Sequence, residues 1–348
     1  MKALLLGCLR NGCTSIQAEH FYTRMIEALR YGGIEGKYHT LFTKAQLRDI
    51  LHFEQPDIVY CADHHIPGDL GEQISPQEIF DEERIPYVGS SPKTINLALS
   101  KSHLKKMWRA NDLPTPHFFL VQKTGSGILG LEEVEGVTDY PYVLKPNKEG
   151  NSRGLDVSSI VFDKNSLILK LEQLLPHYNE VLIEKFLGLA SDIREFTVAM
   201  IGNGQSKLLL PAEIVLRIEK SVRIVTTKDK ENHHTSASPV KDPALNRRLS
   251  ALADQAFEIA GVYDYSRCDM IQAEGKIYAI EINGQPMIPD KWFEACASGV
   301  GLDSDQYLNA IFLASIVRNN YQGKSNLNIP VKMKQHLPKL ILERILNP

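Results

Sequence analysis

At 348 residues the chain is long enough for two or three domains, and with 43% hydrophobic and 23% charged residues it has an ordinary globular composition. A net charge of −3 argues against nucleic acid as a partner, because nucleic-acid binding usually needs a basic face. The five cysteines lack metal or scaffold spacing and indicate free thiols in a reducing cytoplasm, and no stretch approaches transmembrane length.

The first 95 residues alternate apolar runs with helical periodicity, the pattern of a small doubly wound α/β domain. We expect strands over Ala3–Leu6, Lys37–Phe42, Asp57–Cys61 and Ile85–Gly89, and helices over Ile16–Tyr31 and Lys44–Phe53. The segment Gly7–Thr14 nearly matches the phosphate-binding pattern G-x-x-x-x-G-K-[ST], but Cys13 stands at the lysine position. A loop that lines a small-molecule cleft at a strand end is therefore favoured over a P-loop.

Residues 96–187 suggest a second, α+β domain. The expected elements are a helix over Pro92–Asn111, strands over Phe118–Gln122, Tyr142–Lys145, Ser158–Phe162 and Val181–Glu184, and a helix over Asn165–Leu175. Lys145 ends a strand and is followed by a loop with Gly150, Ser152 and Gly154. Such a loop can place an ammonium and backbone N–H groups around phosphates, although an ordinary surface loop has the same composition.

Residues 188–348 suggest a third region in which strands again alternate with helices. We expect strands over Glu195–Ile201 and Leu208–Glu213 and a helix over Pro243–Ala260. The polar, turn-rich stretch Thr226–Pro239 is predicted to be a mobile loop. The apolar positions of Pro338–Leu346 predict a packing helix or a dimer contact.

Two strand-like segments near the C-terminal end carry polar residues at positions two apart. Arg267 and Asp269 share one face of the first strand, and Glu281 and Asn283 share one face of the second. If the strands form a hairpin, oxygen ligands suited to Mg²⁺ and phosphate converge at one place. The alternative is an amphipathic surface hairpin with solvated charges.

The turn of this hairpin provides a geometric test. Asp269 lies opposite Glu281 only if Glu274, Gly275 and Lys276 form a three-residue loop, which is the expected length. A two-residue Glu-Gly loop would pair Asp269 with Ile280 and separate the carboxylates, unless a bulge restored the register.

Taken in order, these segments resemble the ATP-grasp superfamily, and within it the D-alanine–D-alanine ligase-like branch. The resemblance covers residues 85–317. It is carried by Tyr87–Pro92, Leu97–Lys106, Pro141–Gly154, Val181–Leu187, Arg194–Val198, Arg267–Asp269 and Glu281–Pro286. The order and spacing of the motifs, rather than any single one, make the resemblance specific.

The resemblance implies a set of nucleotide-binding residues. Lys145 matches the lysine that contacts the α- and β-phosphates. Glu184, with the backbone of Lys185 and Leu187, matches the hinge that binds adenine. Glu195 matches the carboxylate that holds the ribose hydroxyls.

The resemblance also implies a catalytic end of the site. Asp269, Glu281 and Asn283 match the ligands of Mg²⁺, or of Mn²⁺ in its place. Arg267 matches the arginine that stabilises the reacting carboxylate and the tetrahedral intermediate. Gly154 lies where the family offers a backbone N–H to that intermediate.

Two nucleotide contacts depart from the family pattern. The second ATP lysine of the family aligns with His103, and a shifted Lys101 or Lys105 is the alternative. Lys228 or Lys230, in the predicted mobile loop, is expected to touch ATP when the loop closes.

The other departures concern the positions at which the family binds its two D-alanines. Asn151 replaces a loop serine, and the family's motifs near Ser15–Gln17 and Ala62–Gln73 are missing. Asn283–Met287 also replaces the usual Asn-Thr-x-Pro-Gly. Because most nucleotide and metal positions survive, we expect ATP chemistry with a different pair of substrates.

The sequence therefore predicts an ATP-grasp fold of class α/β (α+β overall), with an N-terminal doubly wound domain (1–95), a central ATP-binding subdomain (96–187) and a C-terminal subdomain (188–348). It predicts an ATP- and Mg²⁺-dependent carboxylate–amine ligase that works through an acyl phosphate on small-molecule substrates. The expected enzyme is a cytoplasmic homodimer without nucleic-acid or membrane partners. The alternatives are D-alanine–D-alanine ligase itself, an ATP-binding protein without ligase activity, and phosphoryl transfer to a non-carboxylate acceptor.

Overall fold

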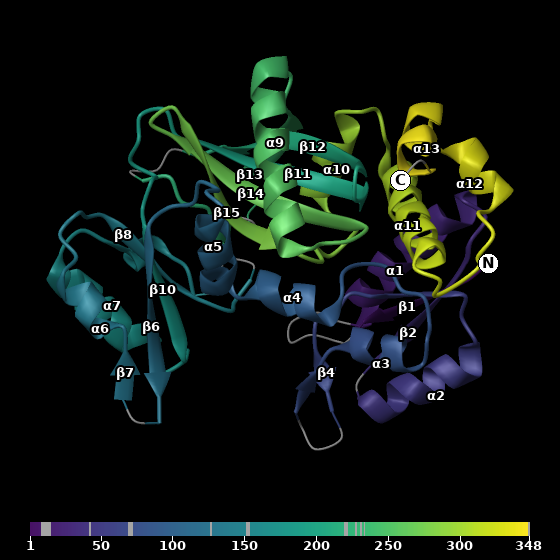
Figure 1. Cartoon of the computed structure of the whole chain (residues 1–348), viewed down its shortest axis with the longest axis horizontal. Helices are drawn as coiled ribbons and strands as arrows, with labels where there is room; N and C mark the ends of the chain where they lie inside the picture. The colour runs from purple at the N-terminus through teal and green to yellow at the C-terminus, as the bar shows by residue number, and fades with distance from the viewer. Residues whose placement is uncertain are drawn as a thin grey trace.

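The computed structural model describes residues 1–7, 15–41, 43–68, 72–125, 127–150, 154–218, 222–226, 228–229, 232 and 234–346, with only the backbone for residues 15–20. Three larger sheets organise this part of the chain (Figure 1). The central sheet lies at one end of the molecule, and the N-terminal sheet and the C-terminal helices lie at the other. Helices α4 (Pro92–Leu99) and α5 (Lys101–Ala110) run between them.

The N-terminal sheet is parallel, with strand order β2-β1-β3. Its elements are β1 (Lys2–Gly7), α1 (Ser15–Tyr31), β2 (Glu35–Thr40), α2 (Lys44–Glu54) and β3 (Ile58–Cys61), followed by β4 (Ile66–Pro67), β5 (Gln73–Ile74) and α3 (Pro76–Glu82). Strand β1 is buried from Ala3 onward, as expected for a parallel strand covered on both faces. The strand expected over Ile85–Gly89 is reduced to one parallel bridge between Tyr87 and Val59.

The central sheet has the order β7-β6-β10-β8-β9, and α7 packs against one of its faces. Its elements are β6 (Phe118–Thr124), β7 (Gly127–Leu129), α6 (Leu131–Glu135), β8 (Tyr142–Pro146), the 3₁₀ turn Val157–Ser159, β9 (Ile160–Val161), α7 (Lys164–Leu174) and β10 (Glu180–Lys185). Alternate residues of β8 and β10 face α7, and Leu144, Val181 and Ile183 are buried there with Leu167 and Leu171.

The C-terminal sheet is antiparallel, with the order β13-β12-β11-β14-β15. Its elements are β11 (Arg194–Asn203), β12 (Ser206–Leu216), β13 (Thr235–Pro239), α9 (Pro243–Ala260), β14 (Tyr265–Ala273), β15 (Lys276–Asn283), α10 (Lys291–Ser298), α11 (Ser304–Tyr321), α12 (Val331–His336) and α13 (Lys339–Leu346). Phe196, Val198 and Met200 face α9, and the intervening Ala199 and Ile201 face α10 and α11.

Helix α11 joins the N-terminal and C-terminal sheets into one core. Its residues Tyr307–Ser315 are all buried, which is the pattern of a helix enclosed on every side. The same apolar cluster contains β1 and α1 residues, such as Leu5 and Met25, and β12 residues, such as Leu210. The sequence tail forms α13, whose Ile341 and Ile345 are buried in this cluster while Leu340 is exposed, so the packing-helix alternative is supported.

Three features of the fold differ from the sequence-based expectation. The helix predicted over Pro92–Asn111 is broken at Ser100 into α4 and α5, because Asn147 caps the start of α5 through its backbone and side chain. Part of the predicted loop Thr226–Pro239 is edge strand β13, whose pairing with β12 its weak apolar pattern does not reveal. Helix α3 was not predicted, although Ser75 and Pro76 provide a start signal.

The sequence-based expectation that no segment is of transmembrane length can be compared with the helices of the described residues. Among them, no helix is both long and apolar enough to cross a membrane.

A buried ion pair links three parts of the molecule. Arg318 of α11 donates from Nε and Nη2 to the two carboxylate oxygens of Asp264, at 2.9 and 2.8 Å. Asp264 also accepts the Gly89 N–H at 2.8 Å, and Arg318 donates to the Tyr87 carbonyl at 2.7 Å. Burial alone would lower the pKa of Arg318, but Asp264 raises it above its usual value, so Arg318 stays charged.

We expect Arg318→Ala to lower the free energy of unfolding by about 3–5 kcal/mol, because it leaves the buried Asp264 carboxylate without its counter-ion. Chemical denaturation measures this loss. Arg48→Ala, which removes an exposed ion pair with Glu82, is the control and should cost about 0–1 kcal/mol. Equal losses in the two variants would show that the buried pair does not hold these segments together.

Candidate active site

The β14–β15 hairpin brings Asp269 opposite Glu281, by a route that differs from the expected one. The expectation of a three-residue loop is wrong: the loop is the pair Glu274–Gly275, because Ala273 pairs with Lys276. A bulge that inserts Ile280 into β15 then restores the register needed for the carboxylates.

The sequence cannot easily reveal this two-residue turn. Both loop residues have positive φ, 52° at Glu274 and 73° at Gly275, and glutamate adopts that conformation rarely. Asp192 holds the turn from outside the hairpin, since its two carboxylate oxygens accept the Glu274 and Gly275 N–H groups, each at 2.7 Å.

One face of the C-terminal sheet carries Asp269, Glu281 and Asn283. Helix α10 covers another part of the same face. The Thr197 hydroxyl donates to Asp269 Oδ1 at 2.7 Å, and the Asn283 amide donates to Asp269 Oδ2 at 3.2 Å. These bonds fix the orientation of the Asp269 carboxylate. The amide oxygen of Asn283 is a third oxygen donor of the set.

The donor set fits Mg²⁺ bound together with substrate phosphates. All three donors are oxygen atoms, the ligands that Mg²⁺ prefers. Among the described residues, no group of three or more His, Cys, Asp or Glu side chains could hold a metal alone. A cation here therefore needs the Asn283 amide and ligands from a bound substrate, as Mg²⁺ sites in nucleotide enzymes do.

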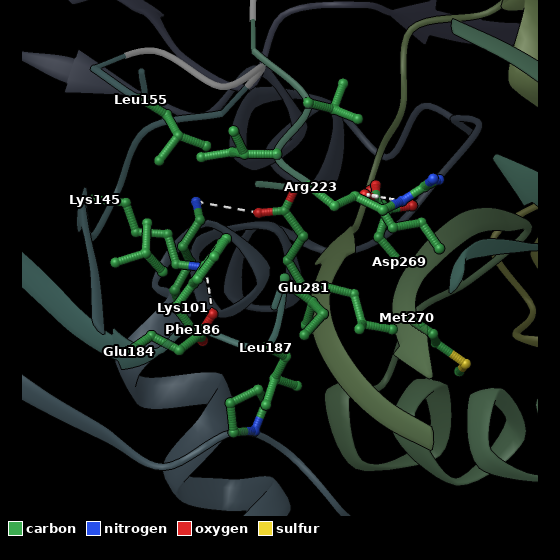
Figure 2. Close-up of a pocket in the computed structure, with 18 of the residues that line it drawn as sticks. Lys101, Lys145, Leu155, Glu184, Phe186, Leu187, Arg223, Asp269, Met270 and Glu281 are labelled. Carbon is green, nitrogen blue, oxygen red and sulfur yellow. Dashed lines mark hydrogen bonds and ion pairs between the residues drawn. The ribbon is translucent and has the colours of Figure 1, made fainter. Parts of the chain in front are cut away.

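Lys101, in the first turn of α5, faces the hairpin carboxylates. Its Nζ lies 3.4 Å from Glu281 Oε2 (Figure 2). The same ammonium also donates to the Glu149 carbonyl. His103, two residues along α5, is exposed to solvent. The structure therefore turns Lys101 into the cleft, and not His103, the residue to which the alignment first points.

A buried carboxylate shared by two lysines lies deeper in the cleft. Glu184 Oε1 is 2.6 Å from Lys145 Nζ (Figure 2). Its Oε2 is 2.7 Å from Lys105 Nζ. Burial alone would raise the pKa of Glu184, but the two ammonium groups outweigh it and hold that pKa below its usual value. Burial lowers the pKa of Lys105 to about 8, even though Glu184 acts to raise it.

The cleft between the central and C-terminal sheets collects most of the predicted residues. Its lining includes Lys101, Lys145, Glu184, Lys185, Leu187, Glu195, Asp269 and Glu281, with apolar side chains such as Val143, Leu155, Phe186 and Trp292 between them (Figure 2). Apolar walls with a few convergent charges are typical of a ligand site.

Sequence reasoning missed Arg223, which also lines this cleft. Its Nε donates to Glu195 Oε1 at 3.0 Å and its Nη2 donates to the Ile214 carbonyl at 2.7 Å. The neighbouring Ile224 packs against Val143 and Phe186 of the central region. The segment 222–225 thus contacts both walls of the cleft, and its strongly polar surroundings in the sequence hid that role.

Arg267 is buried at the end of the hairpin next to α10. Its Nη1 is paired with Asp290, and its guanidinium lies 5.1 Å from the centre of the Trp292 ring. Burial alone would lower the pKa of Arg267, but Asp290 and Asp269 raise it above its usual value. Asp290 and Trp292 were also missed by sequence reasoning, because nothing in the local pattern links them to β14.

Several predicted residues are not brought into the cleft. Lys228 is exposed, and so is Gly154, whose φ of 71° and contact with Pro146 favour glycine there. Neither belongs to the cleft lining found among the described residues. Asn151, Lys230 and the loop Cys8–Thr14 lie outside the described residues.

Two segments at which the family pattern fails meet in space. Gln285, after β15, donates from Nε2 to the Cys61 carbonyl and accepts the Gln77 amide at 3.2 Å. The Gln285 carbonyl lies 3.2 Å from His64 Nε2. This buried polar contact joins Ala62–Gln73 to Gly284–Lys291, so the two departures form one region beside the hairpin.

Comparison with known proteins places this geometry in a family. Residues 107–312, more than half of the chain, match the family model described as D-ala D-ala ligase C-terminus. A D-alanine–D-alanine ligase from Pelagibacter ubique is 30% identical over 239 residues, which cover 67% of this chain and 71% of that protein. The corresponding ligase from Syntrophotalea carbinolica is 29% identical over 269 residues, 75% of this chain and 80% of that protein.

Solved structures support the fold. The Bacillus anthracis D-alanine–D-alanine ligase complexed with ATP superposes with a TM-score of 0.70 at 23% identity, covering 93% of this chain and all of that one. The predicted ATP-grasp fold is therefore confirmed. The chain belongs to the D-alanine–D-alanine ligase family of ATP-grasp enzymes, as the order of its motifs predicts.

Proposed function

We propose that this enzyme uses MgATP to join a carboxylate substrate, such as an amino acid, to an amine through an acyl phosphate, and that its substrates are not two D-alanines. The observation that carries the proposal is the meeting of two lysine–carboxylate pairs, Lys101 with Glu281 and Lys145 with Glu184, across one cleft. Lysines facing oxygen ligands for a cation suit the polyphosphate of a nucleotide.

The cleft residues divide by position into those for the nucleotide and those for its transferred phosphate. We assign the base to the backbone of Lys185 and Leu187, and the ribose to Glu195, which Arg223 orients. Glu184 holds Lys145 towards the phosphates. Lys101 takes the second phosphate contact, in place of His103, because its ammonium already faces the metal carboxylates.

In the first half-reaction an oxygen of the substrate carboxylate attacks the γ-phosphorus, and the bond from that phosphorus to the bridging oxygen of ADP breaks. The products are an acyl phosphate and ADP. Mg²⁺ held by Asp269, Glu281 and Asn283 would neutralise charge on the phosphates. Lys101 and Lys145 add positive charge, so catalysis comes from positioning and electrostatics and needs no protein nucleophile.

In the second half-reaction the neutral amine attacks the acyl carbon. The C–N bond forms, a tetrahedral oxyanion develops, and the C–O bond to phosphate breaks, with the proton of the attacking nitrogen leaving with the phosphate. Arg267 suits the oxyanion: its Nε is buried and has no hydrogen-bond partner among the described residues. A preorganised donor of this kind stabilises charge that develops in the transition state.

The departures from the family pattern support a changed substrate pair. They are concentrated around Gln285 and Ala62–Gln73, which contact each other beside the hairpin, whereas most of the nucleotide and metal positions are retained. The names of the curated relatives favour the second candidate, D-alanine–D-alanine ligase itself. D-Alanine therefore belongs in every substrate panel.

We expect ADP release, and hydroxamate formation when hydroxylamine replaces the amine, with at least one member of a panel of D- and L-amino acids and MgATP. Asp269→Asn combined with Glu281→Gln should abolish both signals with the fold intact, because the cation loses its two carboxylates. Coupled ADP assays, the hydroxamate colour test and thermal unfolding provide the measurements. Glu274→Gln, at the exposed turn of the same hairpin, is the control.

The outcomes separate the alternatives. Hydroxamate from D-alanine and from no other donor would favour D-alanine–D-alanine ligase. MgATP binding without turnover across the panel would favour a nucleotide-binding protein without ligase activity. A stable phosphorylated product without hydroxamate would indicate phosphoryl transfer to another acceptor, and full activity in the double variant would refute the metal site.

Lys101→Ala should weaken MgATP binding by about tenfold or more, because it removes a charge-assisted contact with phosphate. His103→Ala, two positions along the same helix, is the matched control and should leave the affinity unchanged. Isothermal titration calorimetry with MgATP distinguishes the two. If only His103→Ala weakened MgATP binding, His103 and not Lys101 would be assigned as the second phosphate contact.

MgATP affinity should also fall as the pH rises through about 8, the value to which burial lowers the pKa of Lys105. Below that pH Lys105 carries a positive charge beside Glu184 and Lys145; above it the charge is lost and the cleft attracts the nucleotide less. Titrations between pH 7.5 and roughly 9.5 bracket this value and test the prediction. Lys105→Met should remove this fall, and Lys106→Met, at an exposed position, should retain it.

A further inference from the structure

The lining of the cleft includes Trp292, at the start of α10. Arg267 precedes Asp269 by two residues on β14, so their side chains share a face, and Arg267 lies opposite Asn283. Trp292 lines the cleft together with Asp269 and Glu281 and stacks against the Arg267 guanidinium. A substrate that reacts with the terminal phosphate would therefore lie close to Trp292, which contacts Arg267, the partner of Asp290.

Asp290 has one carboxylate oxygen engaged and one available. Oδ2 accepts from Arg267 Nη1 and from the Phe293 N–H at 3.3 Å, which makes Asp290 the N-cap of α10. Among the described residues, Oδ1 has no hydrogen-bond partner, and the side chain is 25% exposed. The carboxylate is thus held in a fixed orientation while Oδ1 remains accessible.

The charged groups at the start of α10 do not form a site for an anion. A helix N-terminus and a nearby arginine would ordinarily attract a carboxylate. Here the carboxylate of Asp290 already occupies the N-terminus of α10 and pairs with Arg267. A second carboxylate placed against Asp290 Oδ1 would meet like charge and no donor, whereas an amino group would meet a hydrogen-bond acceptor.

We propose that Asp290 Oδ1 accepts a hydrogen bond from the amino group of the amine substrate, which attacks as the neutral amine, so that the enzyme selects an amine with no carboxylate beside its nitrogen. Amino-acid amides and diamines are substrates of this class, and the Trp292 ring forms the wall against which the rest of the amine packs. This inference rests on the proposed ligase function and narrows it to one class of acceptor.

The test compares amines that differ only in the group next to the amino-bearing carbon. With the wild-type enzyme, MgATP and the best carboxylate donor from the hydroxamate panel, kcat/KM is measured for glycine against glycinamide and 1,2-diaminoethane, and for each enantiomer of alanine against its amide. We expect about tenfold or greater preference for the carboxylate-free member of each pair. Equal or better use of the amino acids would overturn the proposal.

Asp290→Asn tests the residue itself. Asparagine keeps the N-cap acceptor but removes the charge, so KM for the amides and diamine should rise and the preference over the amino acids should shrink at least about fivefold. A merely structural role would lower kcat/KM for every amine alike and leave the preference unchanged, which would refute the assignment. Asp290→Ser, which also caps helices, provides a second variant if the first unfolds.

Asp303→Asn is the matched control, because Asp303 caps the N-terminus of α11 in the same way. Its amine preference should equal that of the wild type. Failure of the ligase proposal is recognised separately: no hydroxamate with any donor overturns the function and this inference together. Hydroxamate formation without the expected amine preference would refute the role of Asp290 and leave the ligase proposal standing.

Discussion

The arrangement of the molecule depends on one buried charge pair, Arg318 with Asp264. Asp264 directly precedes β14, the strand that carries Arg267 and Asp269, and it also accepts the Gly89 N–H at the exit from the N-terminal region. Two charges buried together are tolerated only when hydrogen bonds satisfy both, and here the carbonyl of Tyr87 completes the set. The start of the reactive hairpin is thus fixed relative to the N-terminal sheet and α11.

The cleft also contains a buried carboxylate whose charge is compensated by neighbouring cations. Glu184 is buried, and its carboxylate is satisfied by Lys105 and Lys145 rather than by solvent. Further along the cleft, the carboxylate of Glu281 faces Lys101, and the carboxylate of Asp269 accepts the Thr197 hydroxyl. A cleft that gathers several lysines and carboxylates is suited to bind a polyphosphate together with its cation.

The sequence and the structure agree best where the signal is local. Alternating apolar residues identify β11 and β14, helical periodicity identifies α9, and positions two apart identify the polar face of each hairpin strand. They disagree where a distant residue sets the local conformation. Asp192 stabilises a two-residue turn that Glu274 would not favour alone, and Asn147 breaks a long predicted helix so that Lys101 begins α5 and faces the cleft.

By itself, the sequence determined the family, the ATP-grasp fold and most of the charged residues that line the cleft, because these depend on ordered motifs and on strand periodicity. The tertiary structure alone decided the bulge at Ile280, the turn of Lys101 and not His103 into the cleft, and the contacts of Arg223, Asp290 and Trp292. These depend on which distant segments meet, since an ion pair between Arg267 and Asp290 leaves no periodic trace in either segment.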